Sequence, residues 1–125
     1  LMGAPADQDK SQAIVDAVQD PRLIDMTGAT SLEELTELIR YSKLYISADT
    51  GPLHLANALK KPLIAMYGTT SPDRTGPYGG DYVHILVSPT SKATAKEPLV
   101  DDTDCMAQLS VDEVWNTYVS LKDTL

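Results

Sequence analysis

The sequence predicts an α/β protein, a Rossmann-like fold in which a mainly parallel sheet carries helices on both faces. Segments with helical periodicity alternate with short apolar segments along the 125 residues, and this order is typical of parallel sheets. Residues 43–47 have no polar residue at alternate positions beyond their start, as expected for a strand buried on both faces. Capping-box patterns, at Thr30 or Ser31 and at Ser110, precede two of the helical segments.

Helical periodicity marks four segments, at residues 7–19, 30–42 and 52–59 and from Ser110 onward. Each is expected to bury one apolar stripe. Pro21 follows the end of the first segment, the capping pattern marks the start of the second, and Pro52 marks the start of the third. The expected stripes are Ala13, Ile14, Ala17 and Val18 in the first segment, Leu32, Leu35, Leu38 and Ile39 in the second, and Val111, Val114, Trp115, Tyr118 and Leu121 in the last.

Short apolar runs predict strands at residues 22–28, 43–47, 62–68 and 82–88. Residues 1–3 resemble the end of a further strand, so we expect the chain to be part of a longer protein. Residues 88–104 are polar and without pattern, which favours a surface connection. The domain is expected to extend over residues 1–125.

Composition narrows the classes of partner. Hydrophobic residues make up 42% and charged residues 22%, as in ordinary soluble domains, and the formal net charge is −8. This charge argues against nucleic acid as a partner, because phosphate backbones are bound by clustered Lys and Arg. One cysteine, Cys105, excludes an internal disulfide and fits a reducing compartment. We expect its thiol to be inert.

The turn "ADTGPLH" supplies the first candidate site. An Asp-Thr-Gly triplet also occurs in aspartic proteases, but their scaffold is almost entirely β-structure, whereas a helix is expected here after Gly51. That glycine allows close backbone approach to a ligand, and the free amides of the following helical turn favour a phosphate group. Asp49 is expected to accept bonds from sugar hydroxyls, and His54 to donate one N–H. The alternative is that Asp49 and Thr50 only cap the helix.

A second candidate site is the turn-rich loop at residues 68–80, in which Arg74 and two threonines, Thr69 and Thr70, could hold phosphate or sugar oxygens. An ordinary surface loop is the alternative. In open α/β sheets ligands bind beyond the carboxyl ends of the strands, and both candidate sites follow predicted strands. His84 is expected to be structural, and the acidic run Asp101, Asp102 and Asp104 to be solvated rather than metal-binding.

These motifs together resemble the carboxyl-terminal half of glycosyltransferase family 9, the ADP-heptose:lipopolysaccharide heptosyltransferases. The resemblance rests on "TGATSLEEL", "SADTGPLHLA" and "YGTTSPDRTGPYG", supported by "GAPAD" near the start and "DCMAQLSVDEVW" near the end. It covers nearly the whole chain, and its two central motifs together are specific.

The resemblance implies one half of a two-domain GT-B enzyme that inverts the anomeric carbon while transferring heptose to the lipopolysaccharide inner core. It implies that this half binds the ADP-heptose-type donor and lacks its own first βα unit. The catalytic base is expected in a missing amino-terminal domain that binds the acceptor, so this chain contains no catalytic residue and is expected to be inactive alone. The donor-binding residues that it implies are Asp7 at the ribose, Thr30 near the adenine, Arg74, and Asp49, Thr50, Gly51 and His54 at the heptose and diphosphate.

The resemblance implies neither a cofactor nor a metal site. It implies a cytoplasmic location, and it leaves open a peripheral contact with the inner face of the inner membrane. An open sheet edge would also leave self-association open. A second hypothesis is a stand-alone nucleotide-binding or interaction module without transferase activity.

Overall fold

The computed structural model describes residues 1–97 and 103–125, so Asp101 and Asp102 of the acidic run lie outside the described residues. The chain divides into two compact units, Leu1–Glu37 and Leu38–Leu125. Each unit is described by itself. The helix α2 (Leu32–Tyr41) begins in the first unit and ends in the second.

In the first unit, residues 1–3 lie beside residues 24–28 with the hydrogen bonds of a parallel pair. The terminal amino group of Leu1 donates to the carbonyl of Ile24 (2.6 Å), and the amide of Met26 donates to the carbonyl of Leu1 (2.8 Å). The amide of Gly28 then donates to Gly3 (2.8 Å). The predicted strand at residues 22–28 is therefore only partly right, because the pairing is present but too short to form a regular strand.

The 3-10 helix η1 (Pro5–Asp7) and the helix α1 (Gln8–Val18) follow this pair. The helix was expected, but the burial of its apolar stripe was not predicted correctly. Ile14 is 44% and Val18 54% exposed, whereas the buried residue of the helix is Ser11. A unit this short cannot cover both sides of a helix, and α1 turns its Ser11 side inward.

The start of α2 confirms a predicted capping box, with Ser31 as the cap. The amide of Ser31 donates to Glu34 Oε1 (2.9 Å), and the amide of Glu34 donates to Ser31 Oγ (3.1 Å). These bonds hold the pKa of Glu34 below its usual value, the Ser31 amide being the larger cause. The apolar stripe that α2 buries is narrower than predicted, because Ile39 is fully buried while Leu32 is 73% exposed.

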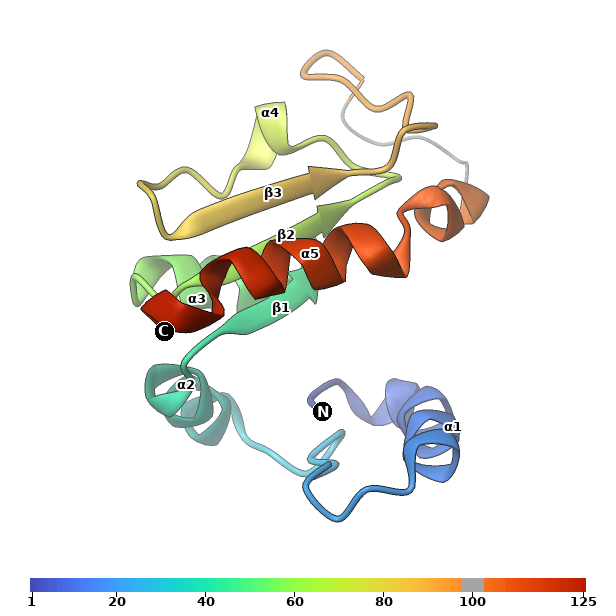
Figure 1. The fold of residues 1–125 in the computed structure, drawn as a ribbon, viewed down its shortest axis with the longest axis vertical. Helices are drawn as coiled ribbons and strands as arrows, with labels where there is room; N and C mark the ends of the chain where they lie inside the picture. The colour runs from blue at the N-terminus through green and yellow to red at the C-terminus, as the bar shows by residue number, and fades with distance from the viewer. Residues whose placement is uncertain (98–102) are drawn as a thin grey trace. The chain divides into compact units, whose positions relative to one another are not determined.

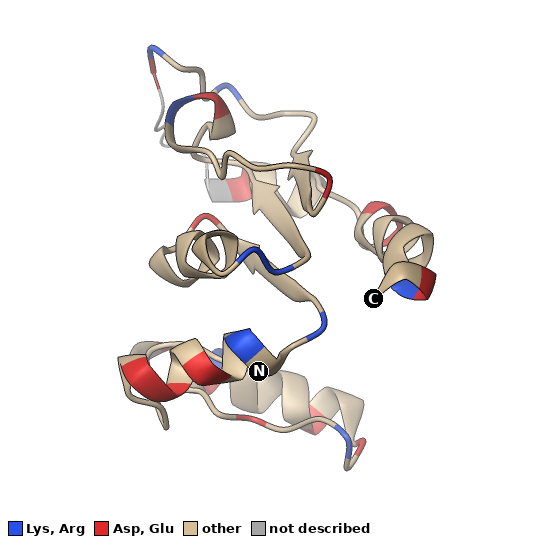
Figure 2. Ribbon diagram, turned by 90° about the vertical axis from the view of Figure 1, so that its left-hand side faces the viewer, with Lys and Arg blue, Asp and Glu red and all other residues tan. Residues whose placement is uncertain are grey.

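The second unit contains a parallel sheet, which confirms the predicted α/β fold class. Its strands are β1 (Tyr45–Ala48), β2 (Leu63–Tyr67) and β3 (Val83–Val87), in the order β1-β2-β3. The helices α3 (Gly51–Ala58) and α5 (Val111–Leu121) lie on opposite faces of this sheet (Figures 1 and 2). The shorter elements are α4 (Pro72–Thr75), η2 (Thr103–Gln108) and η3 (Lys122–Thr124).

Burial is concentrated in the central strand. Leu63, Ile64 and Tyr67 of β2 are fully buried, as is Leu53 of α3. On β1, by contrast, Ile46 is 45% exposed, so the expectation that this strand is buried on both faces is wrong. An edge strand has a neighbour on one side only, and β1 is at the edge of this three-stranded sheet.

The last helix also differs from its predicted packing. Val111 is 83% and Trp115 59% exposed, whereas Val114, Tyr118 and Leu121 are half-buried. The helix therefore turns a narrower apolar face toward β2 than its sequence indicates. Among the described residues, no helix combines the length and the apolar character that crossing a membrane requires.

The burial difference between two neighbouring residues of α2 can be tested. Ile39→Ala should lower the free energy of unfolding by about 2–5 kcal/mol, because it removes fully buried apolar atoms. Leu38→Ala is the matched control and should cost less than about 1 kcal/mol, since Leu38 is 40% exposed. Urea unfolding of both variants provides the measurement, and equal losses would contradict the burial described.

Candidate functional site

The candidate site lies where parallel strands end. β1 ends at Ala48 and leads through Asp49 and Thr50 into α3, while β2 ends at Tyr67 and leads into residues 68–80. Because β1 and β2 are parallel and Ala48 is paired with Met66, both connections begin at the same edge of the sheet. The structure thus brings together the two motifs, which α3 and β2 separate in the sequence.

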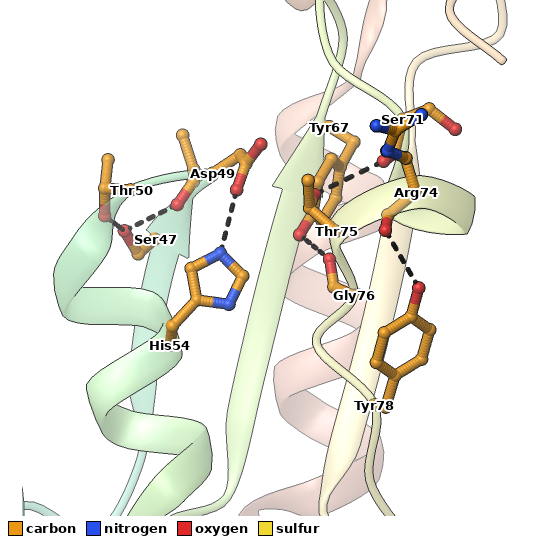
Figure 3. A network of polar contacts seen from close by, with 11 residues as sticks. Ser47, Asp49, Thr50, His54, Tyr67, Ser71, Arg74, Thr75, Gly76 and Tyr78 are labelled. Carbon is orange, nitrogen blue, oxygen red and sulfur yellow. Dashed lines mark hydrogen bonds and ion pairs between the residues drawn. The ribbon is translucent and has the colours of Figure 1, made fainter. Parts of the chain in front are cut away.

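Asp49 and His54 form a contact pair at this edge. His54 Nε2 lies 3.2 Å from Asp49 Oδ1, and the side chains are 41% and 17% exposed, respectively. Since an ionised carboxylate only accepts hydrogen bonds, the imidazole donates from Nε2. Figure 3 shows the ring on the first turns of α3 with Nε2 directed at the carboxylate. Asp49 is therefore held in place and keeps oxygen sites for another donor.

Thr50 does not cap α3 with its side chain. It occupies the N-cap position without a side-chain hydrogen bond to the helix. Its Oγ1 lies 3.2 Å from Ser47 Oγ instead, and Ser47 Oγ donates to the carbonyl of Ala48 (2.9 Å). The interpretation of Asp49 and Thr50 as simple caps is therefore wrong. Pro52 has no N–H, and the amide of Leu53 donates to the carbonyl of Thr50 (3.1 Å), so Gly51 is the residue at the start of α3 whose amide can serve a ligand.

Gly51 has no reason within the described chain to be glycine. Its φ is not in the left-handed region, and a Cβ atom built on it would meet nothing within 4 Å. Gly68 is the opposite case, because a Cβ there would lie 2.5 Å from Met106 Sδ and 2.9 Å from Cys105 Sγ. Gly68 serves internal packing, whereas the open space at Gly51 is accessible to something outside the described chain.

The loop at residues 68–80 has a defined hydrogen-bonded structure. Ser71 Oγ accepts from the amide of Asp73 (3.3 Å) and caps α4. Tyr78 Oη donates to the carbonyl of Arg74 (3.0 Å), and Asn57 Nδ2 of α3 donates to the carbonyl of Tyr78 (3.0 Å). The side chain of Arg74 is exposed and forms no ion pair with the described residues, so its guanidinium is available to an anion.

Tyr67 is a residue of this edge that the sequence reasoning missed. Its side chain is fully buried, and its hydroxyl donates to the carbonyl of Gly76 (Figure 3). Burial, and then the nearby charge of Asp49, raise the pKa of Tyr67 to about 12. The available signal was a hydroxyl-bearing aromatic residue at the end of an otherwise apolar strand.

The first unit carries the other two predicted residues, Asp7 and Thr30. Asp7 Oδ2 accepts from the amide of Ala4 (3.1 Å), and the carboxylate lies close to Gly3, where a Cβ would meet it at 3.1 Å. Thr30 is half-buried and directly precedes the capping residue Ser31. Asp7 therefore lies at the end of the short parallel pair, as expected. The other predicted residues belong to the second unit.

The remaining candidates have no ligand chemistry of their own. His84 is half-buried on β3, and Cys105 is buried beneath the end of the sheet, where its carbonyl accepts from Ser88 Oγ (2.5 Å). No group of three or more His, Cys, Asp or Glu residues could hold a metal ion in the described part of the chain. The polar chemistry of the second unit is thus concentrated at Asp49, Gly51, His54 and the loop that follows β2.

The parallel sheet and the glycine-bearing strand-to-helix turn define a Rossmann-like α/β protein. Residues 1–102 match the family model described as glycosyltransferase family 9 (heptosyltransferase). The chain belongs to this family.

Curated relatives agree with this assignment. Lipopolysaccharide heptosyltransferase 2 of Salmonella typhimurium is 35% identical over 80 residues, covering 62% of this chain and 23% of that protein. Lipooligosaccharide heptosyltransferase 2 of Haemophilus ducreyi is 43% identical over 64 residues, covering 50% and 18%. The chain therefore spans about a quarter of the length of the curated relatives that it matches.

Two solved structures share the fold. The ADP-heptose lps heptosyltransferase II of E. coli superposes with a TM-score of 0.68 at 25% identity, over 98% of this chain and 36% of that chain. A glycosyl transferase family 9 protein of Veillonella parvula superposes with a TM-score of 0.79 at 24% identity, over 96% and 35%, and shows the fold alone.

The raised pKa of Tyr67 predicts a loss of stability in alkali. The folded chain holds this phenolic proton more tightly than the unfolded chain, so the contribution is complete below pH 10 and decreases as pH rises toward about 12. Tyr67→Phe should therefore make the free energy of unfolding decrease less steeply across this window. Urea unfolding at several pH values provides the measurement. Tyr41 is 82% exposed, so Tyr41→Phe is the control and should leave the pH dependence of the free energy of unfolding unchanged. If Tyr67→Phe had the same pH dependence as the unaltered chain, the prediction would be contradicted.

Proposed function

We propose that this chain is the donor-binding part of an inverting glycosyltransferase that transfers heptose from an ADP-heptose-type nucleotide sugar to the lipopolysaccharide inner core. The observation that carries the proposal is the turn from β1 into α3. It combines the amide of Gly51 and the open space beside this glycine with the paired side chains of Asp49 and His54. Membership of family 9 and the printed names of the relatives support the sugar and the acceptor.

Each residue of the turn has a chemical role in the proposal. The amide of Gly51, together with the positive end of the α3 dipole, stabilises the diphosphate, and the missing side chain of Gly51 lets it approach the backbone. Asp49 accepts hydrogen bonds from hydroxyls of the heptose, since its remaining lone pairs are free to do so. Thr50 donates its hydroxyl to a sugar or phosphate oxygen, and His54 acts on the donor through Asp49, to which its Nε2–H is bonded.

The other predicted residues serve the ends of the donor. Asp7 accepts from the ribose diol, which offers two adjacent hydroxyl donors, and Thr30 lines the adenine. Arg74 contributes a guanidinium that neutralises part of the diphosphate charge. Cofactor and metal have no place in the proposal.

In the proposed reaction an acceptor hydroxyl attacks the anomeric carbon of the heptose, and the bond from that carbon to the diphosphate oxygen breaks. The configuration inverts and ADP leaves, with its developing negative charge stabilised by the Gly51 amide and the positive end of the α3 dipole. The attacking hydroxyl gives its proton to a base in an amino-terminal domain of a GT-B enzyme, outside this chain. That domain also binds the lipopolysaccharide acceptor.

A further βα unit, encoded before Leu1, belongs to the same proposal. Tyr45 donates its amide toward β2, so the backbone groups of the next residue, Ile46, point to the other side of β1. Among the described residues no strand pairs with that side. A strand from the added unit would bond this edge and cover Ile46. The complete enzyme would be cytoplasmic, in peripheral contact with the inner face of the inner membrane.

Titration of the chain with ADP, UDP and GDP, followed by NMR, tests the proposal. We expect saturable shifts with ADP at residues 49–54 and 68–74, and weaker effects with the other two nucleotides. Gly51→Ala should weaken ADP binding by at least about ten-fold, because the new methyl group occupies the open space next to the amide of residue 51. Its free energy of unfolding should change by less than about 0.5 kcal/mol.

Gly80→Ala is the matched control for this experiment. A Cβ at Gly80 would also be free of close contacts, with its nearest neighbour at 3.9 Å, but this glycine lies at the far end of the loop. Equal ADP affinity in the two variants would remove the α3 turn from the site. Binding of ADP by a longer protein without sugar transfer would instead favour a nucleotide-binding module.

A further inference from the structure

One buried side chain connects the two motifs of the proposed site. Tyr67 is the last residue of β2 and extends between the Asp49 turn on one side and the loop at residues 68–80 on the other (Figure 3). Its hydroxyl donates to the carbonyl of Gly76, and the charge of Asp49 is close enough to raise its pKa.

The carbonyl of Gly76 depends on the Tyr67 hydroxyl for its hydrogen bond. The residue is buried, and its carbonyl has no second partner among the described residues. A buried carbonyl without a donor is costly, so the loop must shift or admit water when the hydroxyl is absent. The aromatic ring alone would still fill the space in the core. The hydroxyl therefore acts on the loop rather than on the packing of the sheet.

The loop is also attached to α3. Asn57 Nδ2 donates to the carbonyl of Tyr78, and Asn57 lies one helical turn after His54. Tyr78 Oη in turn donates to the carbonyl of Arg74 at the end of α4. The segment that carries Arg74 is thus fixed at one end by β2 and at the other by the helix that begins at Gly51.

We propose that Tyr67 is a positioning residue of the donor site: its hydroxyl fixes the loop at residues 68–80, and with it Arg74, relative to Asp49 and His54. This inference rests on the proposed function, because the group that the fixed loop serves is the diphosphate of the donor. The hydroxyl itself touches no donor atom. Its effect is to keep the guanidinium and the α3 turn in one arrangement before the ligand arrives, which lowers the cost of ordering them on binding.

Tyr67→Phe tests the inference with two measurements on the same chain. Amide hydrogen exchange without ligand should become about ten-fold faster within residues 68–80 and stay unchanged in β1 and α3. ADP should then bind about ten-fold more weakly, while adenosine, which lacks the diphosphate, should bind within about two-fold of the unaltered chain. Tyr82→Phe is the matched control, because the Tyr82 hydroxyl forms no hydrogen bond with the described residues and its loss should affect neither measurement.

The outcomes separate this inference from the proposed function. Unchanged exchange in Tyr67→Phe would overturn the role of the hydroxyl in fixing the loop. Faster exchange with unchanged ADP affinity, or equal weakening of ADP and adenosine, would overturn positioning at the diphosphate and leave the proposed donor site standing. Failure of the unaltered chain to bind ADP would instead count against the proposed function, and the positioning role would be overturned with it.

Discussion

The parallel pairing of β1 and β3 with the buried strand β2 is the constraint on which the second unit depends. Parallel strands need long crossover connections, and here these are α3 with its flanking turns and the loop at residues 68–80. Because all three strands run in one direction, both connections begin at the same sheet edge. The register Ala48↔Met66 then sets Asp49 and Tyr67 near each other, at the carboxyl ends of their strands.

The two motifs at this edge differ in how closely other atoms pack around their glycines. At Gly68 and in the loop after it, the chain is filled closely, and the hydroxyls of Tyr67 and Tyr78 satisfy backbone carbonyls. At Gly51 the surroundings are open, and the side chain of the N-cap residue Thr50 forms no hydrogen bond with the helix. A closely packed loop beside an open helix N-terminus is an arrangement that favours an anionic ligand over internal packing.

The sequence predicted the order of elements, the α/β class and the location of the turn, because these depend on periodicity and on local capping. Ser31 with Glu34 shows this well, since both hydrogen bonds of the box are made by residues three positions apart. Burial was predicted less well. Ile14, Val111 and Trp115 lie on apolar stripes yet are exposed, because a stripe is buried only where another element covers it, and periodicity cannot indicate whether one does.

The links within the candidate site were also beyond the sequence. Asp49 and His54 are five positions apart in the sequence, and the first turn of α3 brings them into contact, so the motif could indicate this contact. The link from Tyr67 to Gly76 depends instead on how the loop folds back over the end of β2, which no local pattern specifies. Thr50 shows the same limit, because its preference for capping is overridden by the neighbouring hydroxyl of Ser47.

The pairing of Asp49 with His54 resolves an electrostatic conflict in the proposed site. A carboxylate next to a diphosphate raises the energy of both groups, and the chain as a whole carries a formal net charge of −8. Asp49 is nevertheless useful there, because a carboxylate is the strongest acceptor for sugar hydroxyls. The Nε2–H of His54 satisfies one of its oxygens and holds the carboxylate in place, and the amide of Gly51 serves the phosphate. One turn can therefore serve the hydroxyl-bearing and the anionic parts of the same donor.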